Sequence, residues 1–311
     1  MEFYIWKDYR CVYDSVQGSA ADSNAPALLL IHPIGVGLSR QFWQPFVHQW
    51  AQIGGASRIY NLDLLGCGDS EMPRRAYTPQ DWAQQIAYFI EQIAKEPVVL
   101  VVQGALLPVA VELMSLPAKA QVKGMVLSGP PAWPLMSSET TAWKTRLAWT
   151  LFSSPLGNLF YRYARREAFL KSFSQRQLFE NEADVTANWL QMLHGGSREM
   201  NSRYAVFSFL AGFWRQDYSG AIAQIQQPVI IVMGETASTI DRKVAKQVDG
   251  QKVTDSDATD SDRAETNRKR LQDYLDHFPR ARGVSISGRN VLPYESTIEF
   301  TQVVSSFMQE L

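Results

Sequence analysis

One short segment constrains the fold of this chain more than any other. Five apolar residues, Val98–Val102, lead through Gln103 and Gly104 directly into the apolar stretch that begins at Ala105. A short continuous apolar run rich in valine is typical of a strand buried on both faces of a sheet. The segment therefore predicts a buried strand, a tight turn and a helix. The residue at the apex of that turn, Gly104, has no side chain.

Helical and apolar segments alternate along the rest of the chain. A helix start is predicted at Thr78 and Pro79, because threonine is a good N-cap and proline fits the first helical position. Further strands are expected at 122–128, 228–233 and 283–287, and a closing helix at 295–308. This order predicts an α/β fold with a mostly parallel central sheet that helices cover on both faces.

The composition limits the classes of protein to which the chain can belong. With 311 residues, 46% of them hydrophobic, and a net charge of −1, it can form one large core with an inserted cap, and nothing indicates nucleic-acid binding. Two cysteines, Cys11 and Cys67, predict a reducing compartment and no disulfide framework. Neither a long apolar run nor a signal-peptide pattern is present, so a cytoplasmic protein without an integral membrane segment is expected.

Three segments resemble the α/β-hydrolase superfamily, in particular its haloalkane dehalogenase and epoxide hydrolase branch. Residues 27–35 resemble the strand and the H-G-x-G oxyanion loop, and residues 58–70 resemble the D-x-x-G-x-G-x-S turn. Residues 98–107 resemble the strand–turn–helix of the nucleophile elbow, with Gln103 where dehalogenases carry a glutamine. The resemblance implies an α/β-hydrolase fold with an inserted helical cap.

The same resemblance places three unreactive residues where the superfamily has its catalytic triad. Gly104 takes the place of the nucleophile, Ala237 that of the acid, and Val291 that of the histidine in a G-x-G-H-x-P-x-E pattern that 288–295 otherwise matches. Val102 and Leu106 replace the flanking glycines of the elbow. We expect Gly104 to have a positive φ, which glycine adopts without strain. The resemblance thus implies a chain without the catalytic machinery.

The resemblance also divides the chain into domains. It implies a core of residues 1–131 and 221–311 and a helical cap of residues 132–220, which is rich in aromatic and basic residues. Most of these aromatic side chains are expected to pack the cap against the sheet, although so many could also roof an apolar pocket. The basic run 161–166 is a candidate contact for acidic partners or membrane headgroups, but a solvated helix face is favoured for so short a run.

Candidate ligand contacts follow from the superfamily pocket and the cap. They are Ile34, Gln103, Gly104, Ala105, Trp133 and Val291. No cofactor is expected.

Two polar stretches are predicted to lie outside the core. Residues 17–26 read as a surface loop, and residues 248–270 as a flexible polar loop with few apolar side chains. The aspartates at 255–262 do not fit a calcium loop, because Asp260 and Thr266 stand where glycine and glutamate are needed. No metal site is therefore expected.

Two functions remain open. The favoured one is a non-catalytic hydrolase homologue, a pseudoenzyme that binds a small apolar ligand or a protein partner through its pocket and cap. The alternative is a hydrolase of an ester, epoxide or haloalkane-type substrate that activates water with Glu235 or Asp241. The pattern also resembles hydrolase-like proteins of cyanobacteria and plastids, which would suggest the plastid stroma or the periphery of a membrane.

Overall fold

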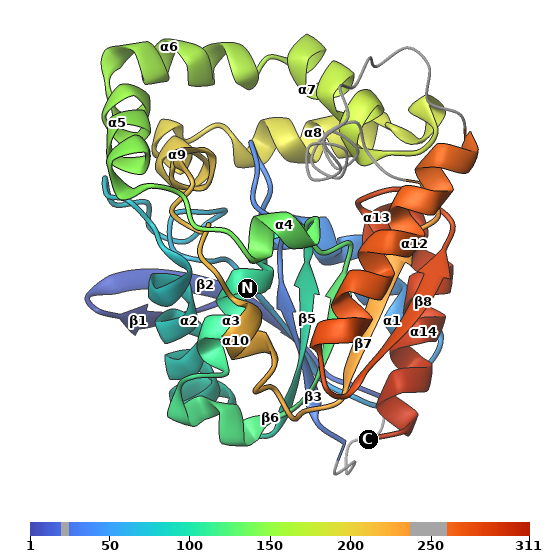
Figure 1. Ribbon diagram of the computed structural model, residues 1–311. Coiled ribbons are helices and arrows are strands. Elements are labelled where there is room, and N and C mark those ends of the chain that lie inside the picture. The colour runs from blue at the N-terminus through green and yellow to red at the C-terminus, as the bar shows by residue number, and fades with distance from the viewer. Residues whose placement is uncertain (20–24, 237–259) are drawn as a thin grey trace.

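The computed structural model describes residues 1–19, 25–236 and 260–311. In this part of the chain eight strands form one sheet in the order β1-β2-β4-β3-β5-β6-β7-β8 (Figure 1). Strand β2 is antiparallel to β1 and β4, and the other neighbouring strands are parallel. The strands are β1 (Glu2–Trp6), β2 (Tyr9–Val16), β3 (Ala27–Ile31), β4 (Ile59–Leu62), β5 (Val98–Gln103), β6 (Val122–Ser128), β7 (Val229–Gly234) and β8 (Ala281–Ile286).

Helices cover both faces of this sheet. They are α1 (Gln44–Gln52), α2 (Pro79–Tyr88), α3 (Leu107–Leu113), α10 (Ser219–Ile222), α12 (Asp260–His277), α13 (Leu292–Glu295) and α14 (Thr297–Gln309), with short helical turns at 40–43, 89–94, 104–106 and 117–121. Thr78 caps α2 as predicted, and its side chain and that of Asp81 form a reciprocal capping box.

Alternation of side chains along the strands divides the core into two layers. Leu29 and Ile31 of β3 lie in the layer beneath α2 and α3, whereas Leu28 and Leu30 lie in the opposite layer beneath α1 and α14. This two-sided burial explains why the parallel strands read as continuous apolar runs.

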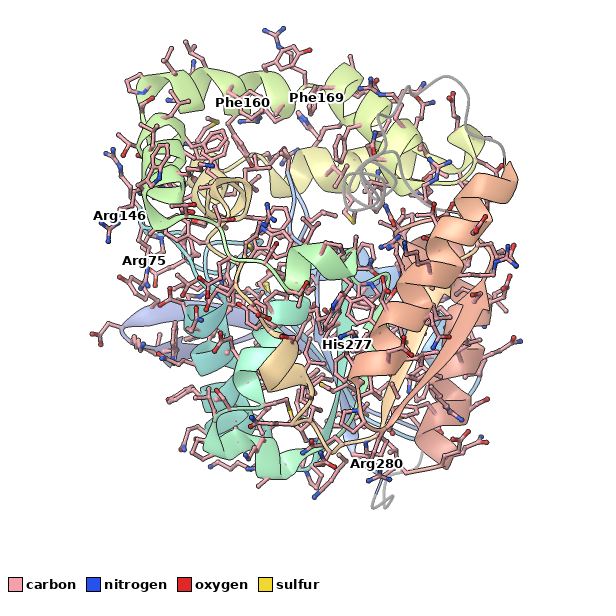
Figure 2. All side chains as sticks on the ribbon, viewed as in Figure 1. Arg75, Arg146, Phe160, Phe169, His277 and Arg280 are labelled. Carbon is pink, nitrogen blue, oxygen red and sulfur yellow. The ribbon has the colours of Figure 1, made fainter. Side chains whose placement is uncertain are left out.

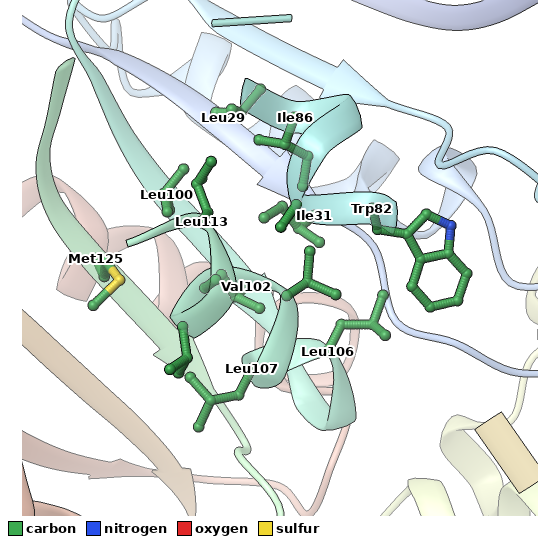
Figure 3. Packing of buried hydrophobic residues seen from close by; sticks show 14 of the residues in the cluster. Leu29, Ile31, Trp82, Ile86, Leu100, Val102, Leu106, Leu107, Leu113 and Met125 are labelled. Atoms are coloured by element: carbon green, nitrogen blue, oxygen red, sulfur yellow. The ribbon is translucent and has the colours of Figure 1, made fainter. Parts of the chain in front are cut away.

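The turn after β5 packs against the core layer that lies beneath α2 and α3. Val102, Leu106 and Leu107 are each 1% exposed and lie in the same cluster as Ile31 and Trp82 (Figure 3). The two side chains that replace the flanking glycines of the elbow therefore contribute to the core of the sheet.

Between β6 and β7 the chain forms a helical insertion, which runs from α4 to α9. Its helices are α4 (Trp133–Met136), α5 (Ala142–Ser153), α6 (Pro155–Ala164), α7 (Glu167–Phe173), α8 (Ala187–Gly196) and α9 (Arg203–Ala211), with short turns at 174–178, 182–184 and 200–202. Helices α5 to α9 lie together beyond the end of the sheet toward which the arrow of β5 points (Figure 1). The insertion thus covers the carboxyl ends of the parallel strands, where ligands of α/β proteins bind.

The structure differs from the sequence prediction in several boundaries, and β7 is shifted by one residue, to Val229–Gly234. Strand β8 begins at Ala281 and ends at Ile286, and the closing helix is split into α13 and α14. Residues 260–270 belong to α12 instead of a polar loop, because Asn267 and Arg270 are buried and donate hydrogen bonds to the carbonyl oxygens of Gly234, at the end of β7, and Pro130, in the loop after β6. Residues 20–24, 248–259, Ala237 and Asp241 lie outside the described residues.

Candidate functional site

The turn after β5 has the backbone of an elbow. Gly104 has a φ of +63°, as predicted from its place between strand and helix. A Cβ atom added to Gly104 would meet only the carbonyl oxygen of Gly129, at 4.0 Å, among the described residues. The geometry therefore has room for a small side chain that the sequence does not provide.

Gln103, immediately before the apex, joins two loops at this edge of the sheet. Its side chain is buried, and its Nε2 donates a hydrogen bond of 2.6 Å to the carbonyl oxygen of Asn290. Its Oε1 is buried without a hydrogen-bond partner among the described residues. Gln103 thus ties the elbow to the loop in which the superfamily places its histidine.

That loop, residues 288–295, carries an apolar side chain at the histidine position. Val291 is 3% exposed and packs in the layer beneath α1 and α14. Glu295 holds the loop by accepting hydrogen bonds from the backbone amides of Arg289, at 2.9 Å, and Glu180, at 2.5 Å. Burial raises the pKa of Glu295.

The helical insertion is hydrogen-bonded to the same loop, residues 288–295. The backbone amide of Asn290 donates to the carbonyl oxygen of Leu178 at 3.1 Å, and its Nδ2 donates to that of Gln177 at 2.9 Å. The guanidinium of Arg289 donates to the carbonyl oxygen of Arg176 at 3.1 Å. Together these bonds fasten the segment 176–180 to the loop, a feature that no sequence pattern indicated.

Trp133 and Ala105 complete the predicted contacts near the elbow. The Trp133 ring stacks on the imidazole of His277, with centroids 3.9 Å apart, and meets Tyr274 edge-on. His277 in turn lies within 2.6 Å of the carbonyl oxygen of Asp273 through its Nδ1. Trp133 therefore packs α4 against α12, while Ala105 lies half-buried in the turn.

His32 is engaged in structural hydrogen bonds. Its Nδ1 lies 2.8 Å from the carbonyl oxygen of Pro33, and its Nε2 accepts from the amide of Leu64 at 3.2 Å. Burial lowers the pKa of His32, which favours the neutral imidazole. Of the others, His48 bonds to Gln52 on α1 and His194 is exposed on α8.

A carboxylate and a thiol that could take part in chemistry differ in their exposure. Glu235, one of the carboxylates considered for water activation, is exposed at the end of β7. Cys67 is buried, and burial raises the pKa of its thiol, so the reactive thiolate is disfavoured. Among the described residues, no group of three or more His, Cys, Asp or Glu side chains is arranged to hold a metal ion.

An apolar cavity of about 310 Å³ lies between the loop after β3 and the helical insertion. Its lining residues are Ile34, Gly35, Val36, Leu38, Phe160, Tyr161, Ala164, Phe169, Leu170, Phe173, Ser174, Leu178, Leu193, Val206, Phe207, Phe209 and Leu210. Phe160 and Phe169 reach it from the outermost helices, α6 and α7 (Figure 2). Of the predicted ligand contacts only Ile34 is among these residues. The many aromatic residues of the insertion had indicated an apolar pocket, and several of them line this cavity.

The two side-chain hydroxyls in this lining are already hydrogen-bonded. The hydroxyl of Tyr161 pairs with Oγ of Ser202 at 2.7 Å, and Oγ of Ser174 accepts from Nε1 of Trp189 at 2.8 Å. The cavity therefore has apolar walls, and its side-chain hydroxyls are satisfied before any ligand enters.

A buried arginine fixes the loop that forms the core side of the cavity. Arg40 pairs with Asp63, with Asp14 at 2.8 Å and with Asp69 at 2.8 Å, and its backbone amide also donates to Asp63. These bonds join the loop after β3 to the loop after β4. The loop after β3, which lines the cavity, is thus held in place by Arg40 and its three aspartates, and none of these four residues lines the cavity.

The fold and these loops can be compared with those of known proteins. The sequence profile of the Alpha/beta hydrolase family matches residues 28–297. The chain belongs to the alpha/beta hydrolase family. No curated protein matches the sequence.

Similar solved structures include three bacterial enzymes. An esterase from Exiguobacterium antarcticum has a TM-score of 0.70 and 14% identity, covering 99% of this chain and 98% of that one. An enol-lactonase from Burkholderia xenovorans has a TM-score of 0.69 and 14% identity, covering 99% and 100%. A meta-cleavage product hydrolase from Pseudomonas fluorescens has a TM-score of 0.70 and 13% identity, covering 100% and 98%. At these identities the likeness extends to the alpha/beta hydrolase fold alone.

Proposed function

We propose that this alpha/beta hydrolase homologue is a pseudoenzyme that binds a small apolar ligand beneath a cap formed by the helical insertion. The observation that carries the proposal is the elbow apex, where the backbone of Gly104 has the conformation suited to a nucleophile and no side chain. Val291 in the histidine loop supports it, because an activated hydroxyl would need an oriented base. We extend the proposal to Ala237 at the acid position from the sequence alone.

The apolar cavity supports ligand binding in place of catalysis. Its volume lies at the small end of the range of roughly 300–1,000 Å³ for ligand pockets. With Tyr161 and Ser174 already hydrogen-bonded, a polar ligand would lose its bonds to water without replacement. The ligand class that fits is a compact hydrocarbon-like molecule, and the predicted contacts near Gln103 and Trp133 stay a proposal.

The second candidate is a hydrolase with unorthodox residues, acting on an ester, epoxide or haloalkane-type substrate. The similar structures are an esterase, a lactonase and a hydrolase, and their names favour this candidate as much as the first. The water-activating residue would be Glu235 or Asp241. Hydrolysis of any such substrate that is lost in Glu235→Gln or Asp241→Asn would establish it.

The proposal is tested by mass spectrometry of small molecules released from the purified native protein. Ala164→Leu adds apolar atoms to the cavity wall, since Ala164 is 2% exposed and lines the cavity. We expect a reproducible apolar molecule from the wild type and loss of it from Ala164→Leu. Ala168→Leu, the same change at an exposed position of α7, is the matched control and should retain the molecule.

Circular dichroism and the melting temperature distinguish loss of the ligand from loss of the fold. A wild-type protein that releases nothing, or an Ala164→Leu variant that is folded and keeps the ligand, would contradict binding in this cavity.

A further inference from the structure

Helix α5 presents apolar side chains to solvent along one stripe. Trp143, Leu147 and Leu151 recur every four residues and are 60%, 62% and 53% exposed. Residues at this spacing share one face of a helix. An apolar helix face is normally buried against another element, so an exposed one indicates an interaction surface.

Helix α6 repeats the pattern directly after α5. Leu156, Leu159, Phe160 and Tyr163 follow the i, i+3, i+4, i+7 spacing and are 63%, 62%, 42% and 52% exposed. The two stripes lie on consecutive helices separated by Ser154 alone. Together with the exposed face of α7 they form what we call the docking face, on the outer side of residues 142–173.

The docking face is strongly basic. Residues 142–173 contain six basic residues and one acidic residue, a net charge of +5 in a chain whose net charge is −1. Arg146 projects from α5 at the edge of the molecule (Figure 2), and Arg162, Arg166 and Lys171 are exposed on α6 and α7. None of these four side chains forms an ion pair within the described part of the chain.

We propose that the docking face binds the surface of an anionic lipid bilayer. Exposed leucine and aromatic side chains beside lysine and arginine are the combination by which interfacial helices bind anionic membranes. No helix in the described residues is long and apolar enough to span a bilayer, so the contact is with its surface. A second copy of the chain fits less well, since a symmetric pair would bring two faces with an excess of positive charge together.

The cavity shares residues with the docking face, since Phe160 of α6 and Phe173 of α7 line it. Phe160, Phe173 and Leu210 line it and are also 42%, 38% and 49% exposed. An apolar molecule dissolved in the bilayer could therefore pass between these side chains into the cavity. This route rests on the proposed ligand binding, whereas attachment to the bilayer does not.

Vesicle flotation tests the attachment. We expect the full chain to float with vesicles of phosphatidylcholine mixed with phosphatidylglycerol, and not with phosphatidylcholine alone. Arg162→Glu with Arg166→Glu should weaken binding by about 25-fold or more, because each basic residue near an anionic surface contributes about fivefold. Leu147→Ser with Leu159→Ser should weaken it by about tenfold or more, through lost apolar burial.

Matched controls carry the same changes elsewhere on the surface. Phe3→Ser with Ile298→Ser removes apolar side chains that are each 60% exposed, and Lys119→Glu with Lys123→Glu reverses two exposed charges. Neither pair should change flotation. Because all these positions are exposed, the variants should keep the melting temperature of the wild type.

Several outcomes would overturn the proposal. They are equal binding to neutral and anionic vesicles, equal losses in the control and docking-face variants, and a wild-type protein that stays at the bottom of the gradient. A dimer in analytical ultracentrifugation that the docking-face variants disrupt would assign the face to a second copy. Release of an apolar ligand from a protein that does not float would refute the docking face and leave the proposed function standing.

Discussion

Substitution of Gly104 by alanine separates the backbone of the elbow from its chemistry. The change adds a Cβ atom and no functional group, so its effect on the free energy of unfolding reports the conformation of the turn. Because Gly104 has a φ of +63°, alanine there would occupy the left-handed region.

The expected magnitude follows from two opposing terms. The left-handed conformation costs a residue with a Cβ atom roughly 1–2 kcal/mol. Replacing glycine also restricts the unfolded chain, which stabilises the native state by roughly 0.4–1 kcal/mol. No steric term is added, since the nearest described atom, the carbonyl oxygen of Gly129, is 4.0 Å from the new Cβ. We therefore expect a net destabilisation of about 1 kcal/mol.

Other glycines of the same chain provide the controls. Gly54 has a φ of +68° and no described atom within 4 Å of the Cβ that alanine would add, so Gly54→Ala should cost about the same. Gly195 also has open space but lies in α8 without a positive φ, so Gly195→Ala should be neutral or stabilising. Gly37→Ala should cost far more, because its Cβ would lie 1.9 Å from the carbonyl oxygen of Leu193.

Urea unfolding followed by tryptophan fluorescence measures these differences, since Trp43 and Trp189 are fully buried reporters. The reasoning is refuted if Gly104→Ala behaves like Gly195→Ala instead of Gly54→Ala. In that case the turn after β5 would not have the elbow conformation on which the pseudoenzyme proposal depends.

Three further predictions concern activity, a buried ion pair and pH. Neither the wild type nor Gly104→Ser should react with fluorophosphonates or hydrolyse nitrophenyl esters, because no oriented base accompanies the hydroxyl; clear labelling on a gel would contradict this. Arg40→Met should destabilise the protein by roughly 3–5 kcal/mol in urea, since it leaves Asp63 buried without its cation, whereas the partly exposed Arg58→Met should cost less than about 1 kcal/mol. The lowered pKa of His32 means that the unfolded chain binds its proton more tightly. Its contribution to stability is therefore complete above about pH 6.5 and is lost as the pH falls toward the folded-state pKa, and His32→Phe should flatten the measured dependence there.

Much of the core could be predicted because its signals are local. The apolar run Val98–Val102 and the cap at Thr78 each determine an element within a few residues, and the structure confirms both. The positive φ of Gly104 was likewise predictable, since the strand and the helix leave room for a single tight turn between them.

The cavity could be predicted only in part. Aromatic side chains in the insertion indicated an apolar pocket, but which of them face it depends on how α6, α7 and α9 pack, and that is decided by distant contacts such as Phe152 against Phe207. Trp133 stacks on His277 because α12 lies against α4, a contact between distant segments that no local pattern indicates. The helix over 260–270 was missed for a similar reason, since Asn267 and Arg270 gain partners only in the folded chain.

The hydrogen bonds between segment 176–180 and loop 288–295 have a mechanical consequence. They anchor the α8 end of the helical insertion to the sheet, so the insertion cannot swing open there as a rigid lid without breaking at least six hydrogen bonds. Helices α5 and α6 have no such anchor to that loop. Any widening of the cavity is therefore concentrated at the end that faces away from the loop, and a ligand of the proposed kind would enter and leave at that end.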